Sequence, residues 1–148
     1  MIADPLGQFE IEHAHALAAL ARLETAALGL RAGEPAAAHL AQAQDVHDFL
    51  ASAVREHNER EERALFPLLG DAAPTAVFVD EHAELRSLER NLAAALHDAN
   101  PDRTADVALD LVALLRAHIA RENDVLFPLA RTVLGPAGLA EVGHRLEA

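Results

Sequence analysis

The chain has 148 residues, with 24 acidic against 12 basic side chains and a net charge of −12. Because no basic cluster interrupts this acidic excess, binding to nucleic acid or to an anionic membrane surface is disfavoured. The chain has no cysteine, which excludes a disulfide framework, a thiolate metal site and a cysteine nucleophile.

The N-terminal segment, residues 1–10, has neither a basic start nor an apolar run, so it does not resemble a signal peptide. No apolar run approaches the ~18 residues of a membrane span. We therefore expect a cytoplasmic protein. Aromatic residues make up only 3% of the chain while alanine and leucine are frequent, which favours helix over sheet.

The apolar spacing predicts four long helices joined by short turns. Their expected ranges are about 6–30, 35–66, 76–99 and 103–127 or a little beyond. A short fifth helix is expected at about 138–147, after the break at Gly135-Pro136. This succession predicts an all-α fold: a single domain over residues 1–148, with an up-down-up-down four-helix bundle over about 6–131 and a short C-terminal fifth helix.

One segment occurs twice. Residues 55–68 read REHNEREERALFPL, and residues 116–129 read RAHIARENDVLFPL. Each copy has a histidine, a glutamate four residues later, and Leu-Phe-Pro-Leu, which we interpret as a helix end whose phenylalanine closes the core. Side chains four residues apart lie on the same face of a helix. Each copy therefore presents an imidazole and a carboxylate in one direction.

Helical phase predicts that these polar pairs face the core. The stripe of the fourth helix is Val107, Leu111, Leu114, His118, Glu122, Val125 and Leu129. The stripe of the second helix is Leu50, Val54, His57, Glu61, Leu65 and Leu68. The first helix has Phe9, His13, Leu17 and Leu20 on one face, and the third has Phe78, His82, Leu85 and Leu92. His15 should face outward, and it replaces His13 only if the first helix is rotated.

These polar side chains should also share one height, roughly 10 Å from the same end of the bundle. Buried carboxylates without partners cost several kcal/mol each and repel one another. Two divalent cations would neutralise them, and each carboxylate could bridge both ions. The predicted metal ligands are His13, His57, Glu61, His82, His118 and Glu122. This nitrogen and oxygen donor set is compatible with Fe, Mn or Zn.

With these residues the chain resembles the hemerythrin-like, or HHE cation-binding, domain family. The family has one histidine on each of the first and third helices and a His-x3-Glu pair on each of the other two. The resemblance covers about residues 8–130. It implies a bundle around a non-haem di-iron centre, with two irons per chain bridged by Glu61 and Glu122.

Two departures distinguish the chain from the oxygen-carrying hemerythrins. Those proteins have a second histidine on the third helix, where this chain has Arg86. They also have an aspartate five residues after the fourth-helix histidine, where this chain has Glu122 four residues after it. A missing imidazole would leave an open position on an iron, which suits reaction with peroxide, nitric oxide or oxygen better than reversible carriage.

We therefore predict a protein that binds or senses a small oxidant or gas (oxygen, nitric oxide or peroxide) or iron. The alternative is a di-iron enzyme that reduces peroxide or a similar oxidant. A ferritin-like oxidase ranks lower, since its Glu-x-x-His spacing occurs only outside the repeated unit, at Glu10/His13, Glu12/His15 and Glu141/His144. A metal-free bundle that binds partners is a further possibility. No oligomeric state is predicted.

The other polar side chains are expected at or near the surface. His47 is predicted to be a core or boundary histidine, too far from His57 to share its metal. The solvated histidines should be His39, His97 and His144. The expected solvated acidic face consists of Glu59, Glu62, Glu81, Glu84 and Glu89, with Glu81 or Glu84 as a spare ligand.

Overall fold

The computed structural model describes residues 4–148 and confirms the all-α class, since that part of the chain contains no strand. The elements are α1 (Pro5–Arg31), α2 (Ala36–Phe49), η1 (Leu50–Val54), α3 (Arg55–Arg60), η2 (Glu61–Leu65), α4 (Phe66–Leu69), η3 (Gly70–Ala72), α5 (Thr75–His97), α6 (Pro101–Arg121), η4 (Glu122–Leu126) and α7 (Phe127–Glu147). The segments η1, η2 and η4 are π-helical turns, and η3 is a 3-10 turn.

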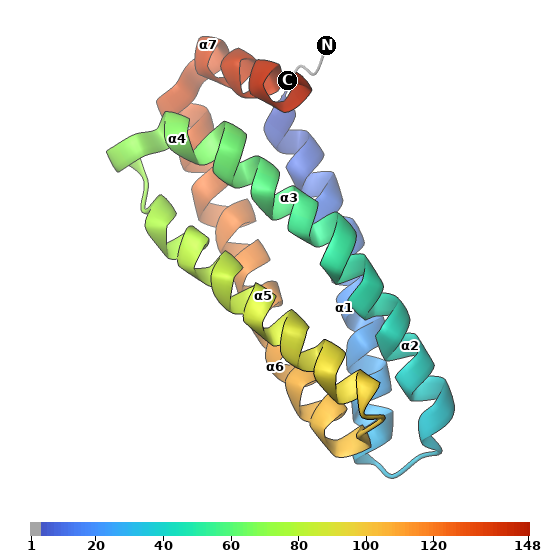
Figure 1. The fold of residues 1–148 in the computed structure, drawn as a ribbon. Helices are drawn as coiled ribbons and strands as arrows, with labels where there is room; N and C mark the ends of the chain where they lie inside the picture. Colours follow the sequence, from blue (N-terminus) through green and yellow to red (C-terminus); the bar gives the residue numbers. More distant parts are fainter. Residues whose placement is uncertain (1–3) are drawn as a thin grey trace.

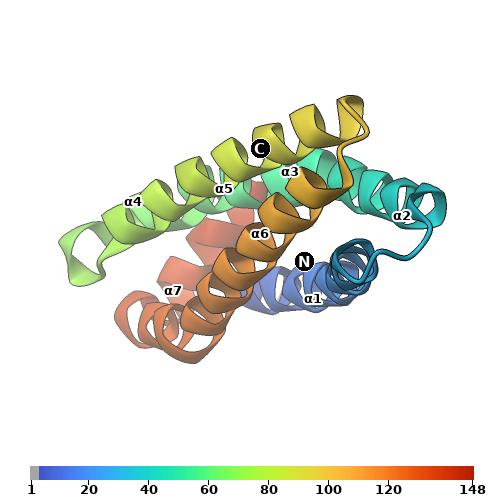
Figure 2. The same ribbon diagram turned by 90° about the horizontal axis from the view of Figure 1, so that it is seen from below.

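Four long helical segments lie side by side (Figures 1 and 2): α1, the run from α2 to α4, α5, and the run from α6 into α7. α1 packs against α2 and α6, and α5 packs against the same two elements, so the four segments surround one interior. Two apolar clusters fill this interior. One lies around Leu20, Leu92 and Leu111, and the other around Leu6, Leu65 and Phe127.

Two helix starts are fixed by the side chains that the sequence offers as caps. The Asp4 carboxylate accepts a hydrogen bond from the Leu6 N–H at 3.1 Å, and the Asn100 side chain accepts one from the Arg103 N–H at 3.1 Å. In both cases proline comes directly after the cap, where its missing N–H costs nothing. These caps set the start of α1 and of α6.

The Leu-Phe-Pro-Leu sequence does not end its helix in the second copy, contrary to our prediction. Pro128 lies in the first turn of α7, which begins directly after the π-turn η4, so its missing N–H is tolerated. The chain bends instead at Gly135, whose φ of 63° is readily adopted by glycine. The predicted tail helix is thus the second half of α7, which crosses the end of the bundle near the start of α1 (Figure 1).

The π-turns correct the predicted apolar stripes. Each turn of a π-helix holds more residues than an α-turn, so the side chains beyond it are rotated about the axis. Val125, predicted to be in the core, is 60% exposed, while its neighbour Leu126 is 1% exposed. Leu17 in α1 was also predicted to be in the core, and this was wrong, since its side chain is exposed. Beyond Glu122, phase inferred from regular α-helix was therefore wrong by about one residue.

One helical stretch, Pro101–Glu147, contains an 18-residue window that is long and apolar enough to cross a membrane by length and composition alone. The same composition is common in core helices of bundles. This stretch packs along α1 and α5 and contains the buried polar side chains His118 and Glu122.

The π-turn η4 leads to a stability prediction. Leu126→Ala should lower the free energy of unfolding by about 2–5 kcal/mol, because it opens a cavity in a packed cluster. Val125→Ala should change it by less than about 0.5 kcal/mol, because the side chain is exposed. Urea denaturation of the two variants measures both values. A larger loss for Val125→Ala would mean that the helix keeps regular α-phase.

Candidate metal centre

The structure brings all six predicted residues into one buried layer between the two apolar clusters. Their nitrogen and oxygen atoms form two groups, and within each group the atoms lie within 4.8 Å of one another. The first group is His13, His57, Glu61 and Glu122, and the second is Glu61, His82, His118 and Glu122. Both glutamates belong to both groups. We name the two halves the His13/His57 position and the His82/His118 position.

Within each position the two imidazoles face each other. His13 Nε2 lies 3.1 Å from His57 Nε2, and His82 Nε2 lies 3.2 Å from His118 Nε2. Two ligand nitrogens on one metal, each bonded at about 2.1 Å, are separated by a comparable distance. The imidazole pairs are therefore spaced as ligands of a common cation.

The two carboxylates lie between the imidazole pairs. Glu61 Oε1 is 3.4 Å from His57 Nε2 and 3.3 Å from His82 Nε2. The Glu122 oxygens are 2.9 Å from His13 Nε2 and 3.4 Å from His118 Nε2. Each glutamate thus reaches one imidazole of each position, which is the arrangement needed for a carboxylate that bridges two metals.

The outer nitrogen of every imidazole is held by a residue from a neighbouring helix. His57 Nδ1 donates to Glu12 at 2.7 Å, His82 Nδ1 to Glu62 at 2.8 Å, and His118 Nδ1 to Glu81 at 2.9 Å. His13 Nδ1 donates to Asn123 Oδ1 at 2.7 Å. Because these oxygens only accept, the proton is on Nδ1 and the Nε2 lone pair points into the centre. This is the tautomer that metal binding requires.

These outer residues were not predicted from the sequence. Glu62 and Glu81 were assigned to a solvated acidic face, and this was wrong for both. The signal was present as a second repeat. The dipeptide Glu-His occurs at Glu12-His13 and at Glu81-His82, and each glutamate binds the histidine of the next long segment. Likewise, the residue after each bridging glutamate binds a histidine of another long segment: Glu62 binds His82 of α5, and Asn123 binds His13 of α1.

Two arginines support the outer carboxylates. The Arg60 guanidinium contacts both oxygens of Glu12 at 2.8 Å, and Arg121 contacts Glu81. Partial burial by itself raises the pKa of Glu12, but bonds from His57 and Arg60 lower it to about 2. Burial likewise raises the pKa of Glu81, but its contacts with Arg121 and His118 outweigh burial and hold the pKa below its ordinary value. Both side chains are therefore ionised acceptors at neutral pH.

In the described chain, the two central carboxylates, Glu61 and Glu122, lack the arginine partners that stabilise the outer carboxylates. Within residues 4–148, all four oxygens of Glu61 and Glu122 are buried without a partner in hydrogen-bond geometry. Burial and the adjacent Glu122 raise the pKa of Glu61 well above its ordinary range. Burial also disfavours the charge on Glu122, but His118 and His13 hold the pKa of that group low. Without a cation, burial and the charge on Glu122 therefore favour the protonated form of Glu61 more than water would.

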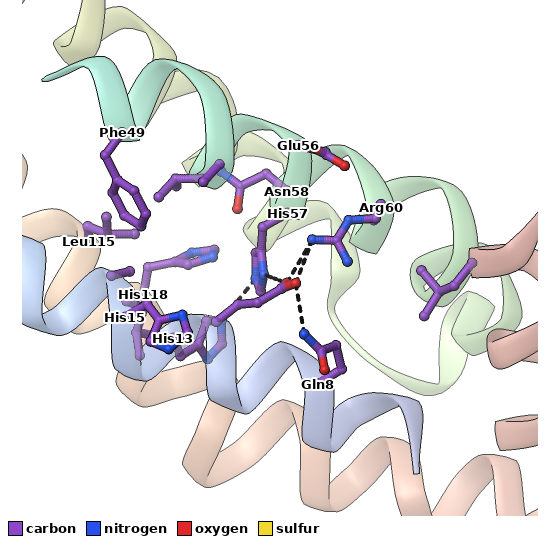
Figure 3. Close-up of a pocket in the computed structure, with 16 residues that line it drawn as sticks. Gln8, His13, His15, Phe49, Glu56, His57, Asn58, Arg60, Leu115 and His118 are labelled. Carbon is purple, nitrogen blue, oxygen red and sulfur yellow. Dashed lines mark hydrogen bonds and ion pairs between the residues drawn. The ribbon is translucent and has the colours of Figure 1, made fainter. Parts of the chain in front are cut away.

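A cleft of about 560 Å³ leads from the surface to this layer, between α1 and the segment from η1 to α3. His13, His57 and His118 form its inner wall (Figure 3). Polar side chains, Gln8 and Arg60, lie toward one end, while the other end is lined by Phe49 and Leu115 (Figure 3). The cleft gives a small molecule a route to the His13/His57 position.

The remaining polar residues lie outside the two groups of ligands. His15 is exposed and lines the cleft, so α1 is not rotated and His13 is the inward residue. His47 is a boundary residue whose Nε2 is 3.0 Å from Glu89. Glu89 was predicted to be solvated, but it is buried.

Arg86 lines a small cavity together with Asn58 and Leu115. Glu59, Glu84, His97 and His144 are exposed, as predicted, whereas His39 is partly buried beside Gly29.

Comparison with known proteins gives one match. The family model described as Hemerythrin HHE cation binding domain matches residues 4–130, which include all six residues of the buried layer. No curated protein and no solved structure matches the chain.

The raised pKa of Glu61 predicts how stability depends on pH. In the metal-free protein, the unfolded carboxyl ionises at a lower pH than the folded one, so stability falls as pH rises above the ordinary value of 4.5. Glu61→Gln should remove this loss and raise the free energy of unfolding at pH 8 by about 1–3 kcal/mol.

Denaturation of metal-free protein between pH 5 and pH 8 measures this effect. Glu59→Gln is the matched control, because it removes one charge from an exposed position two residues away. A gain from Glu61→Gln that is the same at both pH values would contradict a buried, protonated Glu61.

Proposed function

Because this chain belongs to the hemerythrin HHE cation-binding family, we propose that it binds two iron ions in the buried layer and uses them to bind or sense a small oxidant or gas. The ligands are His13, His57, Glu61, His82, His118 and Glu122. The observation that carries the proposal is the pair of four-residue groups that share both glutamates. Two cations would neutralise the buried carboxylates and occupy the space between the facing imidazole nitrogens.

The donor set supports iron among the divalent metals. Imidazole and carboxylate without thiolate suit Fe, Mn and Zn, and of these iron has the redox chemistry with oxygen species. Zn and Mn are compatible with the same ligands. When bound as Fe(II), the pair supplies two electrons, the number that converts hydrogen peroxide and two protons into two waters.

The chain's own residues prepare the site for a small exogenous ligand. Each group offers four protein side chains, and a metal held by them would keep a position for a diatomic molecule or peroxide. Glu12, Glu62, Glu81 and Asn123 keep the Nε2 lone pairs directed inward. The apolar neighbours Phe66 and Phe127 stack on His82 and His13 at ring-centroid distances of 5.9 and 5.4 Å. These rings keep bulk water away from that side of the layer, and the cleft remains as the entry.

The same proposal takes the bundle to be ordered up-down-up-down, with the second half of α7 as a fifth helix over its end. It needs neither nucleic acid nor a membrane, and the net charge of −12 supports this. A cytoplasmic location is consistent with the absence of cysteine.

A second candidate is an enzyme that reduces peroxide. Its support is the absence of a fifth imidazole: in the described chain, Arg86 stands where a further histidine would complete the ligand set, and neither group contains another histidine. The open cleft beside the His13/His57 position is also compatible with substrate turnover.

Metal content tests the first proposal. Purified protein loaded with Fe(II) should contain about two irons per chain. Glu61→Ala and His118→Ala should lose metal, because each removes a ligand, whereas His15→Ala should retain it. Chelation should lower the melting temperature, because an ion that binds only the folded state stabilises it. Equal metal loss in His15→Ala, or a melting temperature insensitive to chelation, would argue against the buried site.

Peroxide kinetics separate the two candidates. An enzyme should consume hydrogen peroxide over many turnovers in the presence of an electron donor, and His118→Ala should abolish the reaction. A sensor should form a stable oxygen or nitric oxide adduct, visible in the optical spectrum, without turnover. His15→Ala is the control in both assays, because its side chain lines the cleft and lies outside both four-residue groups.

A further inference from the structure

The two halves of the centre share one pattern with a single exception. In each half, a glutamate directly before a histidine holds the imidazole of the next long segment, and an arginine supports that glutamate. The residue after each bridging glutamate holds the remaining imidazole. This residue is Glu62 at the His82/His118 position and Asn123 at the His13/His57 position.

This exception gives the two positions different charges. At the His82/His118 position the outer groups are Glu62 and the Glu81–Arg121 pair, which sum to one negative charge. At the His13/His57 position they are Asn123 and the Glu12–Arg60 pair, which sum to zero. The bonds to the imidazoles have similar lengths, 2.7 to 2.9 Å, so the difference lies in the acceptor and not in its distance.

A carboxylate acceptor makes an imidazole a stronger ligand. It draws the Nδ1 proton toward itself and leaves more electron density on Nε2, and removal of such a partner typically costs about 10–100-fold in metal affinity. A carboxamide oxygen is neutral and does this less. Of the four imidazoles, only His13 has a neutral acceptor.

We infer that the two metal positions are unequal: the His82/His118 position binds its cation first and holds it more tightly, and the His13/His57 position binds the second cation more weakly because Asn123 stands where the other half has Glu62. This inference rests on the proposed two-metal site. The weaker position is also the one whose two histidines both line the cleft. The more exchangeable metal is thus the one that an entering molecule meets.

Zinc titration of the metal-free full-length protein tests this order. Two binding steps alone would not suffice, since repulsion between two cations separates the steps in a symmetric site as well. Nuclear magnetic resonance of 15N-labelled histidine identifies which imidazoles respond. At one equivalent of Zn²⁺, the signals of His82 and His118 should shift, while those of His13 and His57 should remain unchanged until the second equivalent.

Two substitutions should equalise the positions from opposite directions. Asn123→Asp supplies the missing carboxylate, so all four histidines should respond at one equivalent. Glu62→Gln removes its counterpart, so all four should again respond together, with the first step weakened about 10–100-fold. Val125→Asp and Glu59→Gln make the same charge changes at exposed nearby positions and should leave the order unchanged.

The outcomes are distinguishable. Simultaneous response of all four histidines in the unmodified protein, or an unchanged order in both Asn123→Asp and Glu62→Gln, would overturn the inference and leave the two-metal proposal standing. Absence of any zinc binding would instead contradict the metal site itself.

Discussion

The burial of two carboxylates, Glu61 and Glu122, among four imidazoles is the constraint on which this structure depends. Neither carboxylate has any exposed surface, and within residues 4–148 neither forms an ion pair with a lysine or an arginine. Such a layer opposes folding, because burial penalises each charge and the two charges repel. The apolar clusters on either side of the layer must offset this cost. In the proposed metal-bound state, cations would neutralise these charges and remove much of that cost.

The hydrogen bonds to the outer nitrogens of the four imidazoles give this buried layer a defined geometry. Each imidazole is bonded to a residue of a different long segment, so the four bonds tie the segments together at the height of the layer. They also fix each ring before any metal arrives. A site that is held in this way loses little side-chain entropy on binding. The charged outer groups, Glu12 with Arg60 and Glu81 with Arg121, lie closer to solvent, where their charges are less costly.

The sequence was sufficient for the parts of the centre that depend on helical spacing. The two His-x3-Glu pairs lie within one α-helical turn, so regular phase places them correctly, and the same holds for His13 and His82. Spacing failed after Glu122, where the π-turn η4 rotates the side chains beyond it and Val125 faces outward; after Glu61, the predicted core residue Leu65 is buried. A π-turn has no simple residue signature.

The outer carboxylates were missed for a different reason. Glu62 and Glu81 are charged and flank the core stripe, so a surface position was the natural expectation for each residue taken alone. Comparison of the two halves separates Glu81 from other surface acids, since Glu12-His13 and Glu81-His82 occupy equivalent places. It does not single out Glu62, whose counterpart is Asn123. The repeat thus contains more than the candidate ligands. It also includes Glu12 and Glu81, which orient the imidazoles, and Arg60 and Arg121, which bind these glutamates.

Comparison of the halves also shows where equivalence ends. A symmetric pair of metal positions would be equally strong and equally accessible. Here, Asn123 weakens one position and the cleft opens beside the same position. The neutral acceptor and the cleft both belong to the His13/His57 position. They arise from separate elements, since Asn123 lies in η4 and the cleft lies between α1 and the segment from η1 to α3. In the proposed two-metal site, one metal would hold the helices together while the other exchanges its ligand, so the bundle could be stabilised by its metals and still react at one of them.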